Sequence, residues 1–180
     1  MKMTLALAMG LVATTAWADC PPPRDLSAQI DPLMEAIRNS SNEREAQRIG
    51  NQLWALWATA PDDRAQEMLD RGLRYRTEYN FDGAWESFDL LVAYCPDYAE
   101  GYNQRAFIAF LRKDYASALD DLEKALARDP DHIAALAGKA LTQIGLDGPE
   151  AGQETLKQAL ALNPWLSERR FLIEDPGQDI

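Results

Sequence analysis

The sequence predicts an all-α protein built from repeated antiparallel helix pairs, and three observations lead to this prediction. Alanine and leucine are abundant while β-branched residues are sparse, a composition that favours helices over strands. Apolar residues recur with helical spacing along much of the chain. One pattern is also written three times, as FDLLVAYCPDYAEGY from residue 88, LEKALARDPDHIAAL from residue 122 and LKQALALNPWLSERR from residue 156.

The three copies are in register at an interval of 34 residues, counted on Pro96, Pro130 and Pro164. Each proline is expected to end one helix, because proline cannot extend the helix before it. Small residues recur where two helices would cross closely, and larger apolar residues recur beside that crossing. The matching slots hold Gly72, Ala106 and Ala140; Ala84, Ala118 and Gly152; Phe88, Leu122 and Leu156; and Leu91, Ala125 and Ala159.

This order of small, small, large, small and proline residues resembles the tetratricopeptide repeat over residues 65–164. The resemblance implies a solenoid of antiparallel helix pairs, stacked as a right-handed superhelix. Three units fill residues 64–164, with bounds 65–98, 99–132 and 133–164. Two slots depart from the family pattern: the early aromatic slot holds Met68, Tyr102 and Leu136, and the later tyrosine slot holds Tyr75, Ala109 and Gln143.

The segments that flank the repeats have different characters. Residues 1–18 have the charged, apolar and A-x-A layout of a secretory signal peptide, with cleavage expected after Ala18. An uncleaved anchor is the alternative. Residues 19–63 are expected to form a proline-rich leader and an N-terminal helix pair, as a degenerate repeat or a cap for the stack. Residues 165–180 are expected to form a C-terminal cap helix and a tail.

Export makes a disulfide between Cys20 and Cys95 the favoured state, because these are the two cysteines of the chain and disulfides persist outside the cytoplasm. The bridge would be worth about 4 kcal/mol in the chain-entropy model. The alternative is a pair of free thiols, with Cys95 packed at a helix end.

Charge and motifs exclude several classes of function. A net charge of −11 argues against nucleic acid and against anionic membrane surfaces, so no direct membrane binding is expected once the signal is removed. The single histidine, His132, is expected to be exposed at a helix start and to have no catalytic role. No zinc, calcium or phosphate-binding motif occurs, so we expect no metal, no cofactor and no enzymatic activity.

The first helices of successive units should line the inner, concave wall of the stack. Helical spacing selects for this wall Gln66, Leu69, Leu73, Arg76, Glu100, Asn103, Phe107, Phe110, Ala134, Ala137, Leu141 and Ile144. Some relatives in the family clamp a chain-terminal carboxylate with basic and amide side chains. The slots of that clamp hold Leu69, Leu73, Gln104, Ala134 and Gly138 here, so the clamp is missing.

The resemblance implies a non-catalytic scaffold that binds a protein or peptide through apolar anchors, and the predicted signal places it in the periplasm. Two alternatives stay open. In the first alternative, the concave wall is filled from within, by Phe171, Leu172 and Ile173 or by neighbouring helices. In the second alternative, the protein is a structural envelope component that associates with a second copy of itself.

Overall fold

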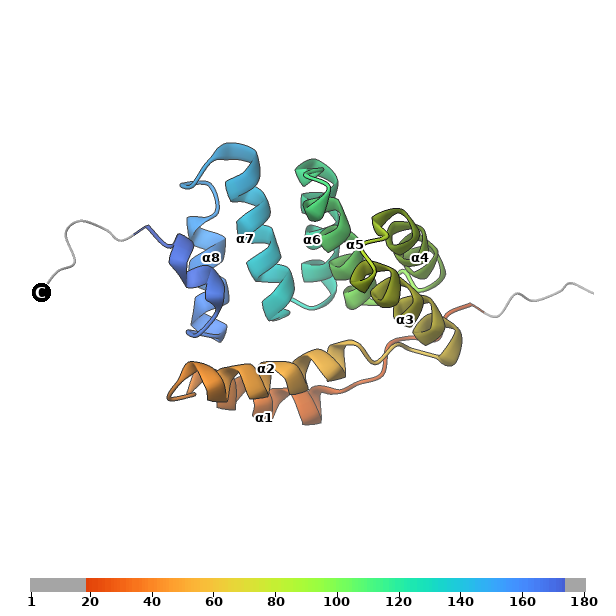
Figure 1. The fold of residues 1–180 in the computed structure, drawn as a ribbon. Helices are drawn as coiled ribbons and strands as arrows, with labels where there is room; N and C mark the ends of the chain where they lie inside the picture. Colours follow the sequence, from red (N-terminus) through yellow and green to blue (C-terminus); the bar gives the residue numbers. More distant parts are fainter. Residues whose placement is uncertain (1–18, 174–180) are drawn as a thin grey trace, which may run out of the picture.

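The computed structural model describes residues 19–173, and within this range every regular element is helical (Figure 1). The predicted signal peptide, residues 1–18, and the predicted tail, residues 174–180, lie outside the described residues. The elements are α1 (Ser27–Arg38), α2 (Glu43–Trp57), α3 (Asp63–Thr77), α4 (Phe81–Tyr94), α5 (Ala99–Leu111), α6 (Tyr115–Arg128), α7 (Ile133–Asp147), α8 (Gln153–Leu162) and a 3₁₀ helix, η1 (Ser167–Phe171).

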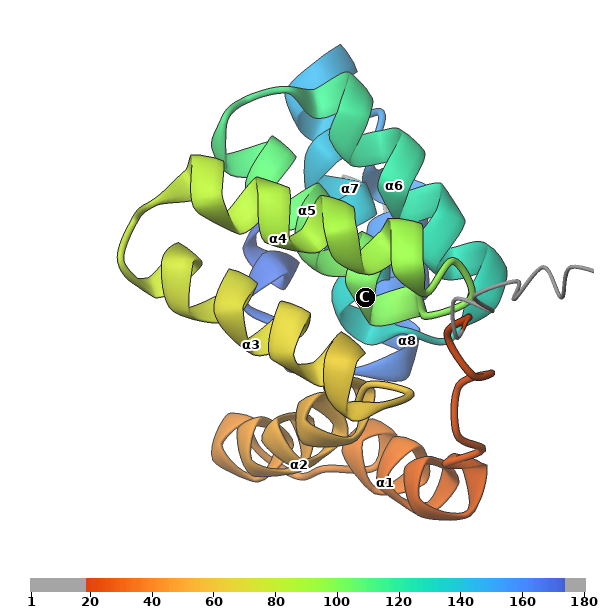
Figure 2. The same ribbon diagram turned by 90° about the vertical axis from the view of Figure 1, so that its right-hand side faces the viewer.

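The three predicted repeat units are present as the antiparallel pairs α3–α4, α5–α6 and α7–α8 (Figures 1 and 2). Pro96, Pro130 and Pro164 lie in the turns after the second helix of each unit, as predicted. The all-α solenoid predicted from the sequence is therefore confirmed.

The small residues lie where the helices cross. A Cβ atom at Gly72 would lie 2.3 Å from the ring of Phe88, and one at Gly152 would lie 2.3 Å from the carbonyl oxygen of Ala140. Ala106 and Ala118 are fully buried at the equivalent crossings. Because a methyl group already fills the available space or exceeds it, the spacing between paired helices is set by these positions.

The N-terminal helix pair does not continue the stack. Figure 1 shows α1 and α2 running across the ends of the repeat helices, beneath α7 and α8. Their apolar side chains, among them Ile37 and Leu53, pack against residues of the last repeat and the segment after it: Ile133, Leu162, Trp165 and Leu166. The predicted degenerate repeat or cap is therefore a helix pair that crosses the stack, because the free apolar surface that matches it lies at the far end of the repeats.

Contacts at both ends hold this pair in place. At one end, Cys20 and Cys95 form a disulfide with a Cα–Cα distance of 5.1 Å. At the other, Trp165 Nε1 donates a hydrogen bond of 2.9 Å to the carbonyl oxygen of Ser40, and Arg169 lies 3.2 Å from a carboxylate oxygen of Glu43. The N-terminal helix pair is thus attached both to the first repeat and to the segment after α8.

The segment after α8 differs from its prediction. The expected cap helix is the single 3₁₀ turn η1, and Phe171 and Ile173 are exposed. The side chain of Gln153, at the start of α8, binds the end of this segment, donating to Phe171 O and accepting from Ile173 N. Phe171 and Ile173 therefore do not fill the concave wall from within.

Candidate partner-binding pocket

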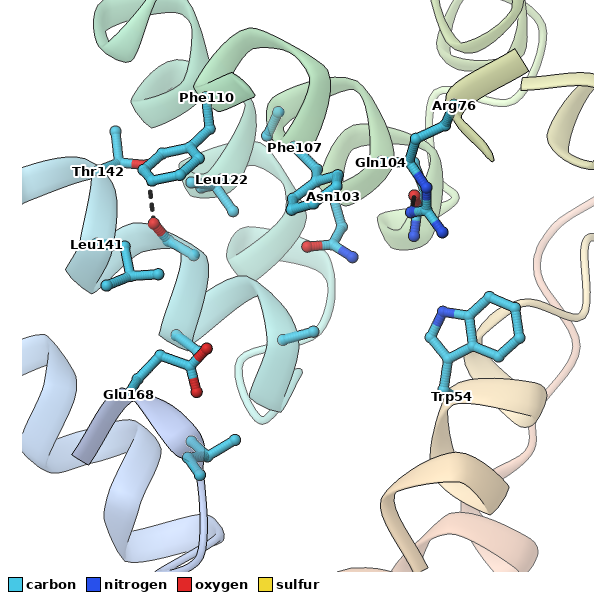
Figure 3. Close-up of a pocket in the computed structure, with 15 residues that line it drawn as sticks. Trp54, Arg76, Asn103, Gln104, Phe107, Phe110, Leu122, Leu141, Thr142 and Glu168 are labelled. Carbon is cyan, nitrogen blue, oxygen red and sulfur yellow. Dashed lines mark hydrogen bonds between the residues drawn. The ribbon is translucent and has the colours of Figure 1, made fainter. Parts of the chain in front are cut away.

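A pocket of about 330 Å³ lies between the concave wall of the repeats and the last part of α2 (Figure 3). Helices α5 and α7 supply most of its apolar lining, and Trp54 of α2 closes the opposite side. A volume of this size is at the lower end of the range for ligand sites. The lining residues are Trp54, Arg76, Asn103, Gln104, Ala106, Phe107, Phe110, Leu122, Ala134, Ala137, Gly138, Leu141, Thr142, Leu166 and Glu168.

The structure brings about half of the predicted wall residues to this pocket. Those that line it are Arg76, Asn103, Phe107, Phe110, Ala134, Ala137 and Leu141. Leu69 and Glu100 are buried, at 0% and 1% exposure, and offer no surface to a partner. Leu73 packs against the core of the first repeat. Gln66 hydrogen-bonds to the backbone of Ala58 and Ala60, so it fixes the turn between α2 and α3 instead.

Ile144 also lies outside the pocket. Its Cγ1 is 2.7 Å from the position that a Cβ atom of Gly152 would occupy. It therefore packs against the start of α8. Leu69, Leu73 and Ile144 thus occupy wall slots but pack against neighbouring helices and do not line the pocket.

The prediction missed two groups of lining residues. Trp54, Leu166 and Glu168 come from outside the repeats, so the 34-residue interval gives no signal for them. Gln104 and Gly138 share one slot, which the sequence singled out only as part of a missing clamp. Thr142 was also missed; it is a polar side chain of the lining whose hydroxyl donates to Gly138 O at 2.8 Å.

A chain of hydrogen bonds runs from the pocket into the core. Arg76 Nη1 donates to Gln104 Oε1 at 2.5 Å, and Gln104 Nε2 donates to Glu100 Oε1 at 2.5 Å. Glu100 Oε2 also accepts from Asn103 Nδ2 at 2.9 Å and lies 3.0 Å from His132 Nε2. The buried carboxylate is thereby surrounded by donors, which offsets the cost of removing it from water.

The environment of His132 differs from the one predicted from the sequence. The side chain was expected to be exposed, but it is fully buried, and its Nδ1 accepts the backbone N–H of Ala135 at 3.3 Å. Since Nδ1 accepts, Nε2 carries the proton that faces Glu100. The ring of Trp57 stacks on the imidazole with centroids 4.3 Å apart. His132 thus caps α7 and joins it to α2 and α5.

Arg76 is the cation of the pocket. It is half-buried, and its guanidinium lies 5.3 Å from the ring centroid of Phe107. Burial lowers the pKa of Arg76, and the negative charge of Glu100 opposes that effect. Among residues 19–173, Arg76 makes no ion pair within 4.0 Å.

The described part of the chain has no cluster of metal-ligating side chains and no membrane-spanning helix. No group of three or more His, Cys, Asp or Glu side chains in residues 19–173 is placed to hold a metal ion. None of the helices that the structure describes is long and apolar enough to cross a membrane.

A stack of three antiparallel helix pairs, repeated every 34 residues and crossing on small side chains, defines a tetratricopeptide-repeat fold. The tetratricopeptide repeat family model matches residues 99–132, the second unit. The chain therefore contains the tetratricopeptide repeat.

Curated relatives carry the same repeat. A TPR repeat-containing protein of Rhizobium etli is 26% identical over 112 residues, which cover 62% of this chain and 55% of that protein. A tetratricopeptide repeat protein 36 homolog of Nematostella vectensis is 40% identical over 81 residues, covering 44% and 45%. The chain thus spans about half the length of the curated relatives it matches.

Two solved structures share the fold. The TPR2B domain of yeast Sti1, in its pHsp70 complex, superposes with a TM-score of 0.55 at 25% identity, over 60% of this chain and 86% of that one. The TPR2AB domain of the same protein, in its pHSP90 complex, gives a TM-score of 0.54 at 24% identity, over 77% and 55%.

Proposed function

We propose that the protein is a non-catalytic scaffold that binds a peptide segment of a partner protein in the pocket between α5, α7 and α2. The observation that carries this proposal is the lining, where Phe107, Phe110 and Leu141 face a space of about 330 Å³. Apolar pockets with a few polar groups are the usual form of a binding site. The complex of the similar Sti1 domain supports a peptide as the ligand.

The pocket differs from an open groove because α2 covers part of the concave wall. A partner helix laid along the whole wall would have to displace Trp54. The pocket instead suits one or two apolar side chains of an extended segment. A small site of this kind gives weak, exchangeable binding, since few side chains are buried.

Two positions on α5 provide a matched test. Phe107 is 44% exposed and lines the pocket, whereas Leu111 is 39% exposed on the same helix and does not. A photo-crosslinking residue at position 107 should capture a partner protein that the same residue at position 111 does not capture. Phe107→Glu should abolish the binding of the captured partner, while Leu111→Glu should leave it unchanged. Equal capture at both positions would contradict the pocket as the binding site.

We also propose that the protein is exported and works in the periplasm. The layout of residues 1–18 and the cysteine pair, which would be reduced in most cytoplasms, support this location. The test is N-terminal sequencing of the protein recovered from the periplasm of a Gram-negative host. The mature chain should begin at Asp19, and recovery in the cytoplasm with Met1 retained would refute export.

Self-association is the alternative function. A stable dimer buries about 800 Å² on each copy, and α2 leaves less of the concave wall free for a second copy. We therefore expect a monomer by light scattering throughout a dilution series. A dimer that dissociates on Phe107→Glu but not on Leu111→Glu would favour the alternative.

A further inference from the structure

The charged groups of the pocket carry information about its ligand beyond the apolar lining. Arg76 comes from α3 and Glu168 from η1, which lie at opposite ends of the repeat stack (Figure 1). Figure 3 shows the two side chains on different sides of Phe107 and Asn103. The pocket is therefore positive at one end and negative at the other, with apolar side chains between them.

Arg76 has N–H donors that form no hydrogen bond within the described residues. Its guanidinium has five N–H groups, and a single hydrogen bond, to Gln104, is formed within the described residues. The side chain is half-buried against Phe107, so water satisfies it less well than at an open surface. A partly dehydrated cation without an ion pair would form a strong ion pair with an incoming carboxylate.

Glu100 is the nearest candidate to neutralise Arg76, but Gln104 lies between the two. The amide of Gln104 accepts from Arg76 and donates to Glu100. Glu100 is also occupied by Asn103 and His132. The free face of the guanidinium is therefore left to the pocket.

Glu168 is the counterpart at the other end. It is half-buried, and in the described part of the chain its carboxylate faces no Lys or Arg nitrogen within 4.0 Å. The neighbouring basic side chain, Arg169, is turned to Glu43. Glu168 accepts one hydrogen bond of 3.2 Å, from Ser167.

We propose that the pocket recognises an internal peptide segment with an acidic side chain on one side of an apolar anchor and a basic side chain on the other. The acidic group pairs with Arg76, the anchor lies between Phe107 and Leu141, and the basic group pairs with Glu168. This inference rests on the proposed function. Because charges flank the anchor on both sides, the bound chain continues past the anchor in both directions, and we assign both charges to side chains of an internal segment.

The net negative charge of the chain makes a preference of the pocket for acidic peptides easy to attribute to one local cation. A chain with a net charge of −11 repels acidic peptides at long range, so its bulk field favours basic ligands. A preference for an acidic residue at a fixed distance from the anchor would therefore come from a local cation. Arg76 is the basic residue among those that line the pocket.

The test is selection from a library of random 12-residue peptides, with both peptide ends joined to the carrier so that no free terminus is offered. Peptides enriched on the wild-type protein should share an acidic, apolar and basic residue in one fixed order. Arg76→Gln should lose the acidic preference and keep the apolar one. Arg76→Lys should retain it, and Glu168→Gln should lose the basic preference alone.

Affinity measurements on one enriched peptide complete the test. Replacing its acidic residue with glutamine should weaken Kd about tenfold for the wild type and leave Kd unchanged for Arg76→Gln. Circular dichroism and urea unfolding of each variant verify that the fold is intact.

The outcomes separate this inference from the function on which it rests. Enriched peptides with an apolar anchor but without charge preference, or with the same preference on Arg76→Gln, would overturn the inference and leave the scaffold standing. If the wild type enriches nothing beyond a Phe107→Glu control, the pocket is no peptide site and both proposals fail.

Discussion

Trp57 at the end of α2 stacks on His132 at the start of α7, with ring centroids 4.3 Å apart and planes inclined by 23°. The indole N–H donates to Asp129 Oδ2 at 2.8 Å, and the carbonyl oxygen of Trp57 accepts from Tyr98 OH at 2.6 Å. One residue of α2 is thereby joined to the turns before α5 and before α7. These contacts fix where α2 crosses the concave wall, so they also set the shape of the pocket.

Replacing Trp57 with alanine should lower the free energy of unfolding by about 3 kcal/mol, the lower end of the range for large aromatic side chains, because Trp57 is half-buried. Trp54→Ala is the matched control. Trp54 lies one turn earlier on α2 and is 41% exposed, so its loss should cost about 1 kcal/mol. Urea unfolding measures both changes. Equal losses would mean that the stack on His132 does not anchor α2.

The buried carboxylate of Glu100 should contribute more to stability than a surface carboxylate. Glu100→Ala leaves the donors of Asn103, Gln104 and His132 without their acceptor, so a loss of about 3 kcal/mol is expected. Glu123→Ala is the control, because Glu123 is exposed and, within residues 19–173, its one ion pair is with Lys139 at 3.3 Å. Its loss should cost less than about 1 kcal/mol. A small effect of Glu100→Ala would show that the network does not hold the second repeat to the third.

The repeat interval predicted the helical stack well because each unit is held by local, periodic contacts. The small residue at 72 and the large residue at 88 contact each other within one unit, so their spacing is visible in the sequence. Asn80 and Asp114 show the same for turns, since each accepts from a backbone N–H three residues later and caps the helix that follows.

The placement of the N-terminal pair could not be predicted in this way. Its contacts join residues more than 70 positions apart, such as Trp57 with Asp129 and Ser40 with Trp165. A tryptophan, an aspartate and a backbone carbonyl have no spacing signature. His132 was misjudged for the same reason: its position at a helix start is local, whereas the ring that buries it belongs to α2.

Asp62 should make the stability of the protein depend on pH in the acid range. Its carboxylate caps α3 by accepting from Ala65 N at 2.8 Å, and it also accepts from Tyr94 OH at 2.8 Å. The bond from Ala65 is the main cause that lowers the pKa of Asp62, against the opposing effect of burial. The carboxylate therefore stabilises the fold above its unfolded pKa of about 4, and this contribution is lost as pH falls through the lower folded pKa.

Asp62→Asn tests this sign, because asparagine still caps a helix but carries no charge. At pH 7 the variant should be less stable than the wild type by about 0.5 kcal/mol, a small value because the site is only partly shielded from solvent. The difference should shrink as pH falls below about 4, through the lower pKa of the folded state. Thermal unfolding across this pH range provides the measurement. A difference that grows on acidification would contradict the assignment.

The disulfide should contribute the largest single increment to stability. Cys20 and Cys95 are 75 residues apart, and closing so long a loop in the unfolded chain is worth about 4 kcal/mol in the chain-entropy model. Thiol titration of the unfolded, unreduced protein should find no free thiol. Reductant should destabilise the wild type but not Cys20→Ser, which already lacks the bond.

The bridge ties the leader of α1 to the end of α4, so its loss should loosen the N-terminal pair first. Hydrogen exchange in α1 and α2 should then rise upon reduction while α5 and α6 stay protected; uniform loss of protection would mean that the pair and the repeats unfold as one unit.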